Sequence, residues 1–283
     1  MANFKNNIED SALSLIKLAL EEDRVNNDAT GIAAFKNEQR KVSVNVVARE
    51  FLVAAGLPVI SLIYGLIDEK ITVKTLFNDG DKINKNETIA VVSGPAISVL
   101  SGERTILNFI QRLTGIATLT AKYVDEVEGT NVKIIDTRKT TPGWRLLEKY
   151  AVKCGGGVNH RFNLADMVMF KDNHIALSGK SITELIKTAR KDFPSLKIAC
   201  EADTIEQVKI LLDADVDIIM LDNMSIEMTK QAVKLAGGGV VLESTGGITL
   251  DNVRAVAKTG VSRISIGAIT HSVKSIDIGM DVN

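Results

Sequence analysis

The sequence is poor in cysteine, in aromatic residues and in any excess of charge of one sign. Its two cysteines, Cys154 and Cys200, can build neither a disulfide framework nor a metal site with cysteine spacing, and they suit a reducing compartment. Aromatic residues are 4% of the chain, which argues against platforms on which nucleic-acid bases stack. Lysine plus arginine number 34 against 35 acids, so no basic excess indicates a nucleic-acid partner.

Long apolar runs are missing as well. None approaches the length of a membrane span. The N-terminal MANFKNNIEDSALSLIKLALEED has acids within and after its apolar stretch, unlike a signal or transit peptide. We therefore expect a cytoplasmic protein with no membrane partner. The rest is ordinary for a globular protein, with 45% hydrophobic and 24% charged residues.

The first part of the chain predicts an α+β unit. Alternating β-branched residues at 42–56 and 71–92 indicate an antiparallel sheet, and the break at 78–81, Asn-Asp-Gly-Asp, predicts a hairpin. Apolar spacing predicts a helix over 8–23, and the run from Leu57 to Ile67 suits another. A long helix is expected from Gly102 to about Glu128, with Arg104 at its start, where unpaired backbone amides favour anions.

From residue 132 the pattern changes to alternating strands and helices. Strands are predicted at 132–136, 166–170, 197–202, 217–222, 239–244 and 263–267. Helices are predicted at 143–153, 182–192, 204–213, 225–236 and 249–259. Such alternation indicates βα units and a barrel of the TIM type, here with fewer than eight clear strands. We predict an N-terminal α+β domain over 1–104 and a catalytic barrel over 105–271, with the tail 272–283 packing on the first domain.

Positive charge is concentrated in the segment 136–161, DTRKTTPGWRLLEKYAVKCGGGVNHR. Six basic and two acidic residues give it a net charge of +4, whereas the whole chain carries −1. Arg138 and Lys139 follow an apolar run, as ligand contacts do in βα barrels. Arg161 follows three glycines and His160. Because two arginines together form a clamp for carboxylates or phosphates, we expect a small, multiply anionic substrate.

Other residues of this segment have a simpler interpretation. Arg145, Lys149 and Lys153 recur every four residues on a predicted helix, which favours an outward, solvated stripe. The triple glycine 155–157 cannot form a helix interior. It suits a close approach of the backbone to a ligand, with a flexible loop as the alternative.

Polar residues follow each predicted barrel strand and should converge on one mouth. They are Thr137, Arg138 and Lys139, then Lys171 with Asp172, Asn173 and His174, then Glu201, Asp222, Thr245, Gly246, Gly247, Gly267 and Ala268. The glycines lie in the last two units, where barrels often hold phosphate, since glycine lets backbone amides approach phosphate oxygens.

Several of these side chains allow more than one role. Lys171 could form a Schiff base or hold an anion, and the nearby arginines favour the anion. Glu201 and Asp222 could pair with the arginines, bind ribose hydroxyls or magnesium, or stabilise positive charge. His160 is expected to contact substrate beside Arg161, while the roles of His174 and His271 stay open.

The segment 136–161 resembles the central signature of the quinolinate phosphoribosyltransferase family. Further stretches match that family in order: GERTILNFIQRLTGIATLT (102–120), FKDNHI (170–175), DIIMLDNM (217–224), STGGI (244–248) and SIGAITHSVKSIDI (265–278). The resemblance implies an incomplete, type II phosphoribosyltransferase-like barrel. It implies transfer from phosphoribosyl pyrophosphate to quinolinate with decarboxylation, assisted by magnesium without an organic cofactor.

The resemblance also assigns residues. A homodimer or higher homo-oligomer is implied, with Arg104 reaching the neighbouring subunit's active site. Substrate contacts are implied for Arg104, Thr137, Arg138, Lys139, His160, Arg161 and Lys171. Glu201 and Asp222 are implied for ribose, magnesium and charge stabilisation. Phosphate contacts are implied for Thr245, Gly246, Gly247, Ile266, Gly267 and Ala268.

The match has departures and alternatives. Cys200 interrupts a common acid–apolar–acid run, Thr245 stands where serine is more usual, and Asn163 replaces a common glycine. A related family associated with molybdate-transport operons shares the fold, but Lys171 and the KDNH run favour the quinolinate enzyme. An aldolase using Lys171 is disfavoured by the arginine cluster. A non-catalytic anion-binding protein is disfavoured because both acids and both glycine loops are kept.

Overall fold

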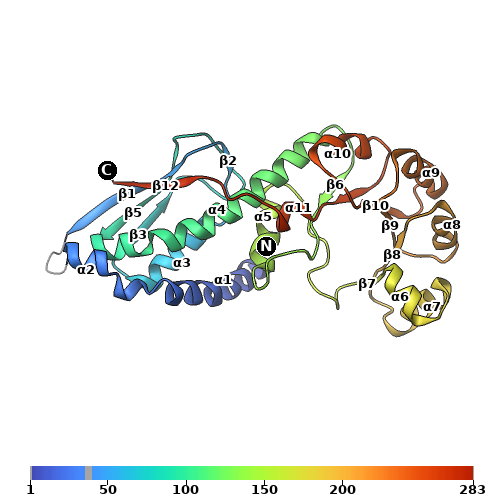
Figure 1. The fold of residues 1–283 in the computed structure, drawn as a ribbon, viewed down its shortest axis with the longest axis horizontal. Helices are drawn as coiled ribbons and strands as arrows, with labels where there is room; N and C mark the ends of the chain where they lie inside the picture. Colours follow the sequence, from blue (N-terminus) through green and yellow to red (C-terminus); the bar gives the residue numbers. More distant parts are fainter. Residues whose placement is uncertain (1, 36–39, 283) are drawn as a thin grey trace. The chain divides into compact units, whose positions relative to one another are not determined.

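The computed structural model describes residues 2–35 and 40–282. Met1 and Asn283, the outer ends of the expected first domain and tail, lie outside the described residues. The chain divides into two compact units (Figure 1). The first comprises Met1–Ala121, Thr140–Gly156 and Ile269–Asn283, and the second comprises Lys122–Lys139 and Gly157–Ala268. The first unit has an antiparallel sheet and the second a parallel one, as predicted.

The first unit is built on a four-stranded antiparallel sheet in the order β12-β1-β5-β3. Its strands are β1 (Lys41–Ala48), β3 (Thr72–Thr75), β5 (Thr88–Pro95) and β12 (Ile278–Val282), beside a separate pair of β2 (Leu52–Val53) and β4 (Lys82–Ile83). Its helices are α1 (Ala2–Glu22), the 3-10 turn η1 (Val25–Asn27), α2 (Ala29–Phe35), α3 (Leu57–Ile67) and α5 (Arg145–Cys154). The last strand, β12, therefore joins the N-terminal sheet through β1.

The predicted hairpin at residues 78–81 is wrong. β3 pairs with β5, whereas β4 pairs with β2. The acidic side chains of the turn bind the backbone instead: Asp79 Oδ1 accepts the N–H of Leu57 at 3.0 Å, at the start of α3, and Asp81 Oδ2 accepts the N–H of Asn78 at 2.7 Å. Residues 78–81 do form a turn, but the strands on its two sides, β3 and β4, belong to different sheets.

The long helix α4 runs from Ala96 to Glu126 and begins before the predicted Gly102. The residues of its predicted apolar face are all buried: Ile106, Leu107, Ile110, Leu113, Ile116 and Ala117. Arg104 is exposed and lies within the helix rather than in its first turn. The argument that free helix amides accompany Arg104 is therefore wrong, and the expected domain boundary at residue 104 falls inside α4.

The second unit is built on a six-stranded parallel sheet in the order β6-β11-β10-β9-β8-β7. The strands are β6 (Lys133–Ile135), β7 (Val168–Phe170), β8 (Ile198–Ala202), β9 (Ile218–Asp222), β10 (Val241–Thr245) and β11 (Arg263–Ser265). All six were predicted. β6 and β7 form the two edges and do not pair within the described residues, so the barrel is incomplete.

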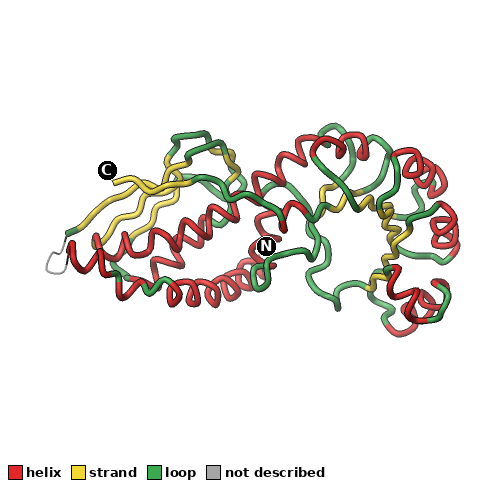
Figure 2. Tube along the Cα trace, viewed as in Figure 1, coloured by secondary structure: helices red, strands yellow, loops and turns green. Residues whose placement is uncertain are grey.

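Helices cover the outer side of this curved sheet (Figure 2). They are α7 (Ile182–Asp192), α8 (Ile205–Asp213), α9 (Ile226–Ala236) and α10 (Leu250–Ala257). Two short helices were missed: α6 (Asp172–Ser178) and α11 (Ala268–His271). They place His174 and His271 in helices rather than in loops. Among the described residues, no helix combines the length and apolar character needed to cross a membrane.

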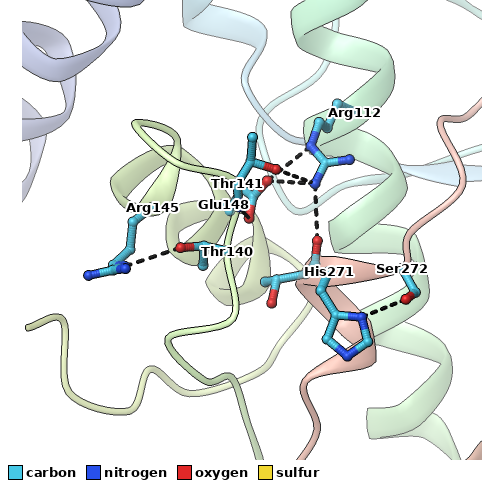
Figure 3. Close-up of polar contacts among 8 residues, drawn as sticks. Arg112, Thr140, Thr141, Arg145, Glu148, His271 and Ser272 are labelled. Atoms are coloured by element: carbon cyan, nitrogen blue, oxygen red, sulfur yellow. Dashed lines mark hydrogen bonds and ion pairs between the residues drawn. The ribbon is translucent and has the colours of Figure 1, made fainter.

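Two expectations for the segment 145–157 are wrong. Lys149 is fully buried with Glu148, so α5 does not present the predicted stripe of solvated cations. Glu148 accepts two hydrogen bonds from Arg112, which supplies the buried side of this helix with its countercharge (Figure 3). Gly155 approaches a helix rather than a ligand, because a Cβ there would lie 2.3 Å from the carbonyl oxygen of Ala117 in α4.

Candidate active site

A cavity of about 680 Å³ opens at the carboxyl ends of the parallel strands in the second unit. Twelve predicted residues line it: Thr137, Arg138, Lys139, His160, Arg161, Lys171, Asp172, Asn173, Glu201, Asp222, Thr245 and Gly246. These come from the ends of β6, β7, β8, β9 and β10 and from the loop before β7. The expectation of one mouth for these strand ends is therefore confirmed for this set.

Other predicted site residues lie elsewhere. Gly247, Ile266, Gly267 and Ala268 are not among the residues that line the cavity. The backbone N–H of Ile266 donates to the carbonyl of Ile135 at 2.9 Å and is already used within the sheet. Arg104 belongs to the first unit. The phosphate and substrate contacts expected of these residues stay predictions.

Two arginines give the cavity its anion-binding character. The Arg161 side chain donates to the Met167 carbonyl at 2.9 Å and to the Met169 sulfur at 3.3 Å, which fixes its direction. Burial, and then the neighbouring charge of Arg138, lower the pKa of the Arg161 guanidinium. Arg138 Nε is buried and has no hydrogen-bond partner among the described residues. A buried donor without an acceptor is costly, so this arrangement favours an anionic ligand.

The acids at the next strand ends face a lysine and an amide. Lys171 Nζ forms an ion pair with Glu201 Oε1, and the Asn223 side-chain amide donates to Asp222 Oδ2 at 3.2 Å. The pairing orients the Lys171 side chain along the cavity wall, where its charge suits anion binding.

His160 is held by two buried carboxylates. Asp136 Oδ1 accepts the backbone N–H of His160 at 2.8 Å, and Asp136 Oδ2 accepts the Asn159 side-chain amide at 2.6 Å. His160 Nδ1 accepts the backbone N–H of Arg161 at 2.7 Å, which places the ring proton on Nε2. That nitrogen lies 3.5 Å from Glu243 Oε2.

The other two histidines have no place at the cavity wall. His174 Nδ1 accepts the backbone N–H of Lys171 at 3.0 Å and so caps α6. His271 is exposed at the end of α11, with Nδ1 2.5 Å from the hydroxyl of Ser272 (Figure 3). Capping is a sufficient structural role for His174.

Sequence reasoning missed five residues that line the cavity. They are Met169, Met220, Asn223, Glu243 and Ser265. Glu243 could have been found, because alternate residues of a strand share a face and Glu243 stands two positions before Thr245. Burial by itself would raise the pKa of Glu243, but the neighbouring His160 and Arg263 side chains lower it below its usual value.

The donor set fits a magnesium ion that is bound largely through a substrate. No group of three or more His, Cys, Asp or Glu side chains in residues 2–35 and 40–282 could hold a metal by itself. Glu201 and Asp222 nevertheless place carboxylate oxygens at the ends of the adjacent strands β8 and β9. One or two carboxylates with phosphate oxygens are the usual setting for Mg²⁺.

Comparisons with known proteins agree over nearly the whole chain. The model of the quinolinate phosphoribosyl transferase C-terminal domain matches residues 116–281, and that of the N-terminal domain matches residues 28–114. A probable nicotinate-nucleotide pyrophosphorylase [carboxylating] of Bacillus subtilis is 46% identical over 86% of this chain and 84% of its own length. The Mycobacterium leprae protein is 40% identical over 96% and 98%.

Solved structures give the same result. The nicotinate-nucleotide pyrophosphorylase of Francisella tularensis superposes with a TM-score of 0.92 at 37% identity, covering 97% of both chains. That of Ehrlichia chaffeensis has a TM-score of 0.90 at 45% identity, covering 95% of this chain and 98% of its own. The fold of this chain is thus that of solved nicotinate-nucleotide pyrophosphorylases.

Proposed function

The chain belongs to the quinolinate phosphoribosyltransferase family, and on this basis we propose that the cavity of the second unit is its active site. The enzyme transfers the phosphoribosyl group of phosphoribosyl pyrophosphate to quinolinate with loss of carbon dioxide. The products are nicotinate mononucleotide and pyrophosphate, a step of NAD biosynthesis.

The observation that carries this assignment is the arginine pair with its unused donor. Quinolinate has two adjacent carboxylates, and Arg138 and Arg161 bring two guanidinium groups close enough to lower the pKa of one. Arg138 Nε is a buried donor that a carboxylate oxygen would satisfy. Lys139 and Lys171 add positive charge along the same cavity. We assign quinolinate to these four cations, with the orientation set by the fixed side chain of Arg161.

The acids act on the other substrate. Departure of pyrophosphate builds positive charge on the ribose, as in glycosyl transfer generally. We assign Glu201 and Asp222 to the ribose hydroxyls and to that charge, and Thr245 with Gly246 to phosphate. Magnesium, held by the two carboxylates and the substrate's phosphate oxygens, would neutralise the leaving pyrophosphate. The ring nitrogen of quinolinate then attacks the ribose carbon. The positively charged ring stabilises the electron pair that carbon dioxide leaves on the ring carbon, and a proton then bonds to that carbon in place of the lost carboxylate.

The protein's contribution is positioning and electrostatic stabilisation. Glu201 Oε1 forms an ion pair with the Lys171 ammonium, so the acid and the cation orient each other before the substrates bind. We further propose a cytoplasmic homodimer or higher homo-oligomer in which Arg104, exposed on α4, completes the neighbouring subunit's quinolinate site.

The test is a turnover assay with quinolinate, phosphoribosyl pyrophosphate and magnesium that follows nicotinate mononucleotide, with nicotinate in parallel. Product from quinolinate alone supports the assignment. Folded protein that forms no product from quinolinate contradicts it and favours the molybdate-associated relative. Binding of quinolinate without turnover would indicate a non-catalytic anion-binding protein. Borohydride trapping of Lys171 with a carbonyl substrate would support the aldolase.

A further inference from the structure

One residue that lines the cavity carries a buried carboxylate that the mechanism above does not use. Glu243 is fully buried in β10, where it is in register with Met220 of β9 and Arg263 of β11. Its Oε2 lies 2.7 Å from Arg263 Nε and 3.5 Å from His160 Nε2. A buried acid at the centre of a parallel sheet is costly unless it is paired. Two cationic or donor groups on one carboxylate oxygen supply that pairing.

The contacts form a chain from this carboxylate to a substrate cation. Glu243 faces the Nε2–H of His160, and the opposite ring nitrogen accepts the backbone N–H of Arg161. The imidazole can accept that amide only while its proton stays on Nε2. A carboxylate at Nε2 favours that tautomer, as an acid fixes the tautomer of a histidine in other sites. The position of the Arg161 main chain therefore depends on a residue that does not itself bond Arg161.

We propose that Glu243 is a positioning residue for quinolinate binding. It acts through His160, whose orientation it fixes, and His160 in turn fixes the backbone from which the Arg161 guanidinium reaches the substrate carboxylate. The inference rests on the proposed function of the cavity. It also alters the expected role of His160: both of its ring nitrogens face protein groups, so its main task is to hold Arg161.

Replacing Glu243 by glutamine tests the contact without changing the shape of the side chain. The amide oxygen can take the place of Oε2, which faces both Arg263 and His160. It carries no negative charge, however, so it holds the two donors more weakly than the carboxylate does. We expect the KM for quinolinate to rise about tenfold or more, the factor that corresponds to about 1.4 kcal/mol. The KM for phosphoribosyl pyrophosphate should stay within about twofold of the wild type, because its contacts are made elsewhere.

A second variant separates positioning from folding. In E243L/R263M an apolar pair replaces the ion pair, which avoids an unpaired Arg263 charge but removes the Glu243 carboxylate from the ring of His160. The KM for quinolinate should stay raised while circular dichroism and the urea midpoint are those of the wild type. The exposed acid of α9, Glu227, gives the matched control E227Q, whose KM should be unchanged. A wild-type KM in E243L/R263M would show that Glu243 only balances charge, and would overturn the proposal.

The route through His160 has its own test. In a His160→Ala background the contact is already gone, so adding E243Q should change the KM for quinolinate by no more than about twofold. If the two substitutions raise the KM for quinolinate independently, so that their effects multiply, Glu243 does not act through His160 and the proposal is refuted. The turnover of the wild-type protein is measured first, over the same concentrations of both substrates. Absence of wild-type turnover would reject the proposed function, whereas wild-type turnover with an unchanged KM in E243Q would reject only the role of Glu243.

Discussion

Replacing Glu148 by glutamine should cost the first unit about 3 kcal/mol of unfolding free energy, because it breaks a buried ion pair from one side. The carboxylate is fully buried, whereas the Arg112 side chain is 25% exposed. Glu148 Oε1 accepts from Arg112 Nε at 2.9 Å and Nη2 at 2.6 Å, and Oε2 accepts the Thr141 N–H at 3.2 Å (Figure 3). Arg112 also reaches the Thr141 hydroxyl and the Thr270 carbonyl.

The magnitude follows from these contacts. Removing one partner of a buried pair costs roughly 3–5 kcal/mol, since the other charge is left uncompensated. Glutamine keeps one acceptor, and solvent reaches part of Arg112, so the lower end of that range applies. The surface pair Arg49–Asp281 has side chains that are 35% and 49% exposed. Solvent screens such a pair, so Asp281→Asn, which should change the stability little, is the matched control.

The measurement is urea unfolding followed by tryptophan fluorescence. Trp144 is the only tryptophan in the sequence and stacks on Phe109 in the first unit, with ring centroids 4.6 Å apart, so its signal reports that unit. Combining Glu148→Leu with Arg112→Met should recover most of the loss, because both charges are then removed. A shift for Glu148→Gln no larger than that for Asp281→Asn would refute the reasoning, and would mean that solvent screens this pair as it screens a surface pair.

Further tests concern the site and the thiols. Arg138→Ala should lose about 2–5 kcal/mol of transition-state stabilisation, whereas Lys209→Ala, at an exposed position of α8, should leave kcat/KM unchanged. If Arg138→Ala lowers kcat/KM by less than about tenfold, the arginine clamp is contradicted. Mixing Arg104→Ala with Arg138→Ala subunits should restore some activity, and no recovery in confirmed mixed oligomers would reject a shared site. Burial, ahead of nearby acids, raises the pKa of Cys200 and of Cys154 to about 12. Both thiols are then protonated at pH 8, and Ellman's reagent should modify native protein about a thousandfold more slowly than unfolded protein. Equal rates in the two states would contradict the burial of the thiols.

Periodicity predicted most of the barrel because its elements are regular and local. The central strand Ile218–Asp222 is an apolar run that is buried along most of its length, and α9 begins at a recognisable cap, Ser225. Twelve predicted residues line one cavity for a related reason: strand ends of a parallel sheet share one edge. What failed depended on contacts between distant residues. The loop at 78–81 carries a hairpin signature, yet strand pairing is decided by sheet partners that the turn does not encode.

Charge was the least reliable guide to burial. Lys149 has the spacing of a solvated stripe but is fully buried, and the neighbouring Glu148 owes its burial to Arg112 on another helix. Glu243 was passed over because a single acid in an apolar strand has no local signal of its partner. Its countercharge, Arg263, stands in the next strand, and only the sheet register brings the two together. Long-range pairing of this kind follows from the fold and not from composition.

The placement of acids around Arg161 explains why its charge remains available to a ligand. The acceptors that its side chain contacts are a carbonyl and a thioether, Met167 O and Met169 Sδ, which orient the guanidinium without neutralising it. The carboxylates of Asp136 and Glu243 contact His160 instead of Arg161. Asp136 accepts the backbone N–H of His160, and Glu243 faces its ring. A carboxylate directly on Arg161 would occupy the donors that quinolinate needs. Because these acids support Arg161 through His160 and do not bind it directly, the Arg161 side chain is held in place and can still bind an anion. Preorganisation of this kind is what electrostatic catalysis requires.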